Sequence, residues 1–105
     1  AKAPAGEQLH AGDLVMDLRE HTVAKGGVPV DLAPIEFQVL QYFLTHPGQV
    51  ISRTELLHRV WGEDFSSEDK IVDVNIRRIR MKVEDNPSSP AHLVTVWGQG
   101  YRWIV

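Results

Sequence analysis

The sequence contains no cysteine, which excludes disulfide bonds and thiolate metal sites. It has no initiator methionine, and its first residues, AKAPAGEQ, are too small and polar for a signal peptide. No apolar stretch approaches the roughly 18 residues that span a bilayer. We therefore expect a cytoplasmic fragment or processed chain without a membrane segment, in which residues 1–8 are an interdomain linker and residues 9–105 form one domain.

The sequence also lacks the groupings that catalysis or metal binding would need. It has no glycine-rich phosphate loop, and no nucleophile, base and orienting residue stand out together. The histidines do not have the spacing of metal ligands; they are His10, His21, His46, His58 and His92. We expect no catalytic residue, no metal and no cofactor, and hence no enzyme.

Positive charge is scarce except in one segment. The formal net charge of the 105 residues is -3. Residues 70–82, however, hold five basic side chains and one acid, a local charge of +4 that leaves -7 for the rest of the chain. Local potential governs contact with phosphate, so this segment is compatible with nucleic-acid binding as well as with a solvated helix face.

The first third of the chain has the pattern of short strands. Apolar and β-branched runs cover Leu14 to Leu18, Thr22 to Ala24 and Val28 to Leu32. Gly26-Gly27 separates the last two runs, and paired glycines favour a hairpin turn because they accept positive φ. These runs predict a small antiparallel sheet.

Two helix starts follow. Pro34 at the first helical position and Glu36 at the third predict a helix from Pro34 to about Thr45, ended by His46-Pro47-Gly48. Its cap position is Ala33, which cannot cap with a side chain. Ser52 and Glu55 form the pattern of a capping box, which predicts a second helix from Arg53 to about Val60.

A third helix and a hairpin complete the chain. Ser66 or Ser67 is expected to cap the helix, whose apolar residues recur at helical spacing: Val72, Ile76, Ile79 and Val83. The closing stretch LVTVWGQGYRWIV predicts a hairpin over residues 93–105. The order predicts an α+β fold, a winged helix-turn-helix in which the hairpin is the wing.

The side of the third helix opposite the apolar stripe is mostly cationic. It carries Lys70, Val74, Arg77, Arg78 and Met81, and towards its flanks Asn75, Arg80 and Lys82. Arginine pairs with guanine, asparagine with adenine, and apolar side chains contact the thymine methyl, so this face suits a major groove. We expect Asp73 to pair with Arg53 or another arginine; the alternative is that it accepts a hydrogen bond from cytosine.

These segments together resemble the winged-helix effector domain of OmpR/PhoB-type bacterial response regulators. The resemblance rests on Glu36-Phe37, VISRTELLHRVWG, KIVDVNIRRIRMKV and TVWGQGYRW, and it covers the chain from about Leu9 to Val105. It implies a four-stranded N-terminal sheet, three helices and a wing. It also implies sequence-specific binding to double-stranded DNA and transcription regulation in a two-component phosphorelay. Expected partners are a preceding receiver domain phosphorylated by a histidine kinase, RNA polymerase, and a second copy bound head-to-tail on direct repeats.

The resemblance also implies roles for individual residues. Base readers are expected at Val74 and Arg78. Backbone or flanking contacts are expected at Trp61, Lys70, Ile71, Asn75, Arg77, Arg80, Thr95, Gln99 and Tyr101. The loop that faces RNA polymerase comprises Glu63, Asp64, Phe65, Ser66 and Ser67.

Two questions stay open at this point. The same fold could be a protein–protein interaction module that uses its exposed aromatic residues. Trp97, next to the hairpin turn, has no positive charge to place in a narrow minor groove. We expect the indole to pack on its own domain, the alternative being contact with a sugar-phosphate edge. Gly98 and Gly100 are expected to allow a tight turn and a close approach to phosphate.

Overall fold

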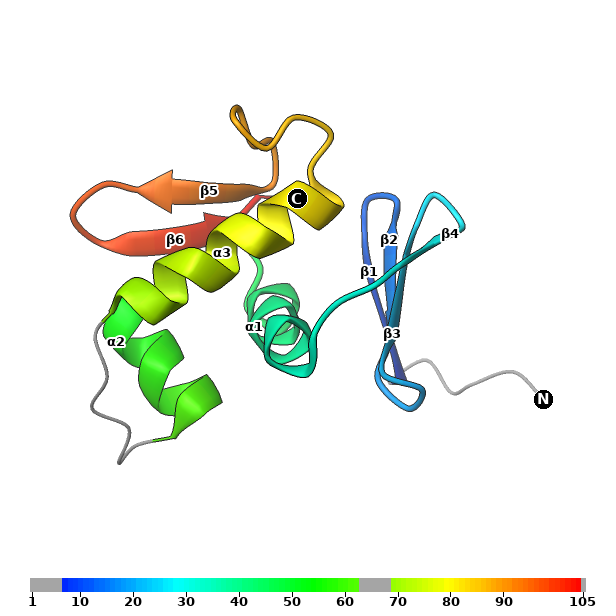
Figure 1. Ribbon diagram of the computed structural model, residues 1–105, viewed down its shortest axis with the longest axis horizontal. Coiled ribbons are helices and arrows are strands. Elements are labelled where there is room, and N and C mark those ends of the chain that lie inside the picture. Colours follow the sequence, from blue (N-terminus) through cyan, green and yellow to red (C-terminus); the bar gives the residue numbers. More distant parts are fainter. Residues whose placement is uncertain (1–6, 63–68, 105) are drawn as a thin grey trace.

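A computed structural model describes residues 7–62 and 69–104 of the chain. A four-stranded sheet lies at one end of the molecule, and the helices and a two-stranded hairpin form the rest (Figure 1). The helices are α1 (Pro34–Thr45), α2 (Arg53–Leu56), the π-helical turn η2 (Leu57–Trp61) and α3 (Lys70–Val83). The predicted winged helix-turn-helix architecture is confirmed.

The N-terminal sheet is an antiparallel meander in the order β1-β2-β3-β4. Its strands are β1 (Gln8–Ala11), β2 (Leu14–Asp17), β3 (Thr22–Lys25) and β4 (Val28–Val30). Gly26 and Gly27 both have positive φ in the β3–β4 turn, as the paired glycines predicted. The apolar runs did not indicate β1, which the resemblance implied. Gln8, expected in the linker, is the first residue of β1.

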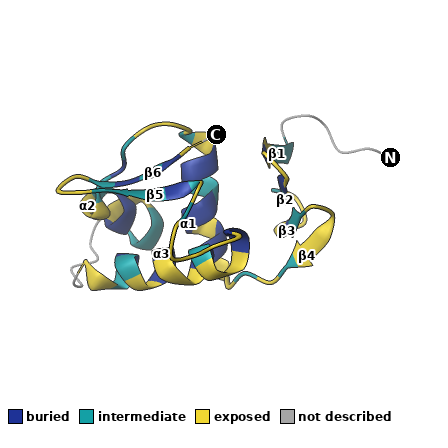
Figure 2. Cartoon of the chain, turned by 90° about the horizontal axis from the view of Figure 1, so that it is seen from above, coloured by how far each residue is buried: buried dark blue, intermediate teal, exposed yellow. Residues whose placement is uncertain are grey.

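Helix α1 has the predicted bounds, and the core forms around it. Phe37, Val39, Leu40 and Phe43 on α1 are all 3% exposed or less. The four residues of the stripe on α3 are equally enclosed, at 0 or 1% exposure. Figure 2 shows the buried residues gathered where α1, α3 and the hairpin face one another. Burial of this apolar surface is the main stabilising contribution to the fold.

The two predicted helix starts each hold half of a capping box. At α1 the Glu36 carboxylate accepts from the Ala33 amide at 3.0 Å, but alanine has no side-chain acceptor to return the bond. At α2 the Ser52 hydroxyl accepts from the Glu55 amide at 3.0 Å. The Glu55 carboxylate accepts instead from the Tyr42 hydroxyl at 2.5 Å, so it joins α2 to α1.

The second and third helices differ from the prediction in their bounds. The second is α-helical only to Leu56 and continues as η2, where Gly62 at φ 120° ends it. The third begins at Lys70, with Asp69 at its cap position and no side-chain cap bond. The expected caps, Ser66 and Ser67, lie outside the described residues.

The C-terminal hairpin joins β5 (Leu93–Val96) to β6 (Gly100–Trp103). The segment before α2 pairs with β6: the Ile51 amide donates to the Tyr101 carbonyl at 2.8 Å, and the Tyr101 amide donates to the Ile51 carbonyl at 3.0 Å. Gly100, at φ 143°, lies where this pairing is closest, because a Cβ there would fall 2.1 Å from the Ile51 oxygen. The close approach predicted for Gly100 is therefore to Ile51, within the fold.

Candidate nucleic-acid interface

Helix α3 presents one exposed face, opposite its buried stripe. Lys70, Arg77 and Arg78 are exposed there, with no ion pair to any described residue. Val74 is 45% exposed and Met81 65% exposed, although both are apolar. The predicted combination of cationic and apolar side chains on one helix face is thus present. Such a face offers charge to phosphates and apolar contact to base edges.

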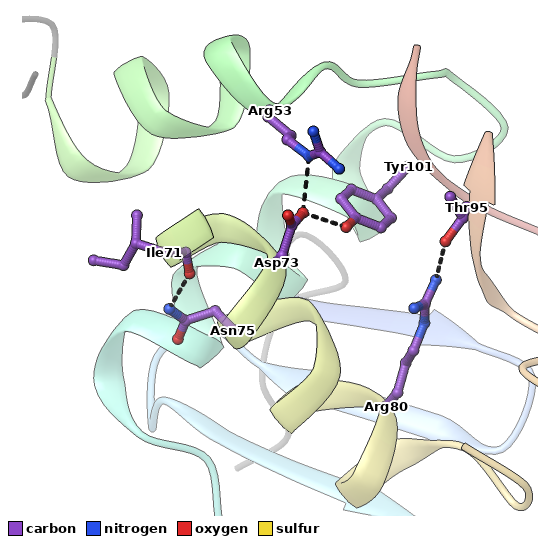
Figure 3. Close-up of polar contacts among 7 residues, drawn as sticks. All are labelled: Arg53, Ile71, Asp73, Asn75, Arg80, Thr95 and Tyr101. Atoms are coloured by element: carbon purple, nitrogen blue, oxygen red, sulfur yellow. Dashed lines mark hydrogen bonds and ion pairs between the residues drawn. The ribbon is translucent and has the colours of Figure 1, made fainter. Parts of the chain in front are cut away.

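Asn75 does not belong to this face, contrary to the expectation. It is 4% exposed, and its amide nitrogen donates to the Ile71 carbonyl one turn earlier at 2.8 Å (Figure 3). Ile71 is half-buried and packs against the core. Asn75 and Ile71 lie one helical turn apart on a side of α3 that faces the core. Asn75 is therefore removed from the candidate DNA contacts.

Arg80 binds the hairpin. Its Nε donates to the Leu93 carbonyl at 2.8 Å. Its Nη2 donates to the Thr95 hydroxyl at 2.9 Å (Figure 3). Its guanidinium also lies over the Tyr101 ring, 5.5 Å from the centroid. Arg80, expected to contact DNA, is therefore a link between α3 and both hairpin strands.

Lys82 is likewise engaged within the fold. Its Nζ lies 2.7 Å from the Glu36 carboxylate on α1. Burial raises the pKa of Glu36, but the hydrogen bonds from Lys82 and from the Ala33 amide outweigh burial, and the pKa lies below its ordinary value. The pair holds α3 on α1. On the described part of α3, the cations that make no such contact within the fold are Lys70, Arg77 and Arg78.

Asp73 lies at the meeting point of α2, α3 and β6. Its carboxylate accepts from Arg53 Nε at 2.8 Å, which confirms the predicted pairing, and also from the Tyr101 hydroxyl (Figure 3). Burial raises the pKa of Tyr101, and the hydrogen bond to Asp73 raises it further. Tyr101 is only 6% exposed, so its hydroxyl serves this internal contact and is removed from the candidate phosphate contacts.

The tip of the hairpin is exposed and holds the least buried large apolar residue described. Trp97 is 89% exposed, so the expectation that it packs on its own domain is wrong. Its place explains this: the Gln99 amide donates to the Val96 carbonyl at 2.9 Å, closing a turn with Trp97 and Gly98 at its centre. A side chain at the outer corner of such a turn has no neighbouring element to cover it.

A groove runs between this tip and the starts of α2 and α3. Its lining includes Ser52, Arg53, Thr54, Asp69, Thr95, Val96 and the tip residues Trp97, Gly98, Gln99 and Gly100. Thr95 and Gln99, two expected contact residues, lie in this groove. Trp61, another, is half-buried against the core. Residues 63–67, the expected polymerase-facing loop, lie outside the described residues.

No pattern in the sequence indicates the role of Glu84. This residue follows α3 and is 6% exposed. Its carboxylate accepts from three backbone amides at the start of the hairpin: Ala91 at 2.9 Å, His92 at 3.0 Å and Leu93 at 2.7 Å. A glutamate just after a helix carries no cap signature, so only the folded connection reveals that it orients the wing.

Within residues 7–62 and 69–104, no group of three or more histidine, aspartate or glutamate side chains is arranged to hold a metal ion. No helix in these ranges is long and apolar enough to cross a membrane.

A family model described as "Transcriptional regulatory protein, C terminal" matches residues 27–103. The chain belongs to this family. The match includes all three helices and the wing, the parts that form the exposed face and the groove.

Curated relatives place this domain within longer proteins. The chain is 43% identical over 94 residues to the sensory transduction protein RegX3 of Mycolicibacterium smegmatis, covering 90% of the chain and 41% of that protein. It is 51% identical over 71 residues to the alkaline phosphatase synthesis transcriptional regulatory protein SphR of Synechococcus elongatus, covering 68% of the chain and 28% of that protein. The chain therefore spans less than half the length of these relatives.

Solved structures agree on the winged-helix fold. The response regulator DrrB of Thermotoga maritima, an OmpR/PhoB homologue, superposes with a TM-score of 0.87 at 32% identity, covering 94% of the chain and 45% of DrrB. The DNA-binding domain of Klebsiella pneumoniae RstA, solved in complex with the RstA box, gives 0.85 at 34% identity, covering 93% of the chain and 97% of that domain. The domain is thus of the OmpR/PhoB type.

Proposed function

We propose that this domain binds double-stranded DNA in a sequence-specific manner and regulates transcription as the effector domain of a two-component response regulator. The observation that carries the proposal is the exposed face of α3, where Arg77 and Arg78 lie between the apolar Val74 and Met81. The complex of the related RstA domain with its DNA box supports it. In the proposed complex α3 enters the major groove, and the wing lies on the adjacent backbone.

The proposed role of each side chain follows from the charged, polar or apolar group that it leaves exposed. Arg78 reads a base edge through its guanidinium, and Val74 contacts a thymine methyl. Lys70 and Arg77 neutralise phosphates and position the helix. Thr95 keeps a hydroxyl proton to donate, since its oxygen accepts from Arg80. Gln99 offers an exposed amide at the wing tip.

The wider assembly is proposed from the family resemblance. A receiver domain phosphorylated by a histidine kinase precedes this domain, and two copies bind direct repeats head-to-tail. Residues 63–67 contact RNA polymerase, and the protein acts in the cytoplasm. The length of the relatives supports the first point, since this chain covers 41% of RegX3.

Salt dependence tests DNA binding directly. Sites are selected from random duplex, and affinity for a selected duplex is measured over a range of salt concentration. If several phosphates are neutralised, the logarithm of the affinity falls linearly with that of salt concentration, with a slope of about -0.9 per phosphate. A flat response, or no duplex binding at low salt, contradicts the proposal.

A protein-interaction module is the second candidate, favoured by the exposed indole of Trp97. Its binding would depend on apolar contact and would change little with salt. The salt titration therefore separates the two functions, because only contact with many phosphates gives the steep slope.

A further inference from the structure

The chain has one exposed sulfur atom, and it lies on α3. The sequence holds no cysteine and two methionines, Met16 and Met81. Met16, on β2, is 0% exposed, whereas Met81 is 65% exposed. A small oxidant therefore reaches the Met81 thioether directly, but it reaches Met16 only when the sheet opens. Oxidation of sulfur in the folded domain is thus confined to one position.

Met81 lies near the middle of the exposed face of α3. Successive helical residues are about 100° apart around the axis, so a residue seven positions after Val74 returns to within about 20° of it. Arg77 and Arg78 come four and three residues before Met81, and side chains at these spacings are neighbours on a helix. Exposed residues follow one another along this side of α3 (Figure 2). Met81 thus shares its surface with the groups proposed to contact bases and phosphates.

Oxidation by a peroxide changes this surface. The sulfur lone pair attacks a peroxide oxygen and the O–O bond breaks. Sulfur keeps one oxygen as a sulfoxide, and hydrogen peroxide is reduced to water. The product is polar where an apolar group stood, so it loses its contact with an apolar base edge. Its new oxygen accepts hydrogen bonds, and the guanidinium groups of Arg77 and Arg78, one turn earlier, are the nearest exposed donors.

We propose that Met81 is a reversible oxidation site, and that its conversion to the sulfoxide by a peroxide weakens DNA binding. This inference rests on the proposed binding of DNA by α3 and adds a control that acts on α3 itself. A methionine sulfoxide reductase, which regenerates the thioether, restores binding. The fold is unaffected by the oxidation, because the Met81 side chain contributes little to the core.

Mass spectrometry of the folded domain treated with hydrogen peroxide tests the site. Cleavage after glutamate places Met16 in residues 8–20 and Met81 in residues 69–84, so each methionine is read on its own peptide. The Met81 peptide should gain one oxygen atom, while the Met16 peptide stays unmodified until the domain is unfolded in urea. A duplex recovered by selection should slow the oxidation of Met81, because it covers this face. Equal oxidation of both methionines in the folded domain, or no protection by bound duplex, contradicts the assignment.

Affinity for the selected duplex tests the consequence. Peroxide should weaken binding by the wild type roughly tenfold, as for the loss of one buried apolar side chain, and the reductase should restore it. Met81→Leu keeps an apolar side chain of similar volume but has no sulfur. Its affinity should be close to that of the wild type and unchanged by peroxide. Met81→Gln, which places a polar acceptor at this position, should bind about as weakly as the oxidised wild type.

Two controls separate this effect from general damage. Met16→Leu removes the buried sulfur and should stay as sensitive to peroxide as the wild type. The oxidised wild type should unfold at the same temperature as the untreated protein; a lower temperature would trace the loss of binding to unfolding and overturn the inference. If peroxide weakens Met81→Leu as much as the wild type, or if oxidised Met81 leaves affinity unchanged, the inference is wrong and DNA binding stands. If the untreated wild type binds no duplex, the proposed function itself fails.

Discussion

The phenolic hydroxyl of Tyr101 on β6 donates a hydrogen bond to the carboxylate of Asp73 on α3. The same carboxylate accepts from Arg53, and the Tyr101 ring lies beneath the guanidinium of Arg80. Wing and helix are therefore joined by a connected set of polar contacts. The orientation of the wing relative to α3 is therefore already set in the free domain. Binding a ligand that contacts both elements then requires little further ordering of the chain.

Removing the Tyr101 hydroxyl tests this connection. Tyr101→Phe keeps the ring under Arg80 but deletes the bond to Asp73, and we expect a loss of about 1 kcal/mol in the free energy of unfolding. Urea denaturation measures it. The raised pKa of Tyr101 means that its contribution is complete below the ordinary value of 10.0 and is lost as pH rises through the folded pKa. The variant should therefore lose less stability than the wild type in this alkaline range; parallel curves would contradict the assignment.

The ion pair between the buried Glu36 and the exposed Lys82 predicts sensitivity to acid. The pKa of Glu36 is lower in the folded chain than its ordinary value of 4.5. The stability it contributes is thus present above pH 4.5 and is lost as pH falls through the folded pKa. Lys82→Met should move the acid unfolding midpoint to higher pH. Arg77→Met, which removes an exposed cation from the same helix, is the matched control and should leave the midpoint in place.

Two glycines in the wing should respond differently to alanine. Gly98 and Gly100 both have positive φ, but a Cβ meets nothing within 4 Å at Gly98 and meets the Ile51 backbone at Gly100. Gly98→Ala should cost about 1 kcal/mol in stability, from backbone strain alone. Gly100→Ala should cost about 3 kcal/mol or more, since it also breaks the pairing of Ile51 with Tyr101. Equal losses of stability in the two variants would show that the wing moves independently of the segment before α2.

Glu84 is expected to matter for folding more than its position in the sequence suggests. Glu84→Ala leaves three amides at residues 91–93 without their acceptor, and we expect a loss of about 3 kcal/mol. Asp85→Ala, a change at a carboxylate whose side chain is 95% exposed, should cost little. Thermal unfolding of the two variants measures the difference, and a similar melting temperature for both would refute the structural role of Glu84.

Local signals were strong enough to predict much of the fold. The bounds of α1 follow from Pro34 at the first helical position and the stop at His46-Pro47-Gly48. The stripe on α3 follows from helical spacing. The π-helical end of the second helix has no sequence pattern of its own, and β1 lacked a clear alternation. Both take their form from packing against the rest of the molecule.

The candidate site could be predicted only in part, because sequence spacing does not show which polar groups pair inside the fold. Val74, Arg77 and Arg78 emerge on the exposed face as expected. Asn75 and Tyr101 turn inwards, where their side chains satisfy partners on α3. Trp97 differs from its prediction in the other direction. We expect an apolar side chain to pack on the domain, but the turn at Gly98 directs the indole to solvent.

The central claim is that the exposed face of α3 reads DNA sequence, and Arg78 tests it most directly. The measurement is the affinity of Arg78→Ala for the selected duplex and for its single-base-pair variants, with Lys70→Ala alongside. Loss of a base contact should cost roughly 1–3 kcal/mol on the selected duplex and relax the preference at one base pair, while Lys70→Ala weakens all duplexes alike. If Arg78→Ala weakens the selected and scrambled duplexes equally, Arg78 contacts phosphate and this account of base reading is contradicted.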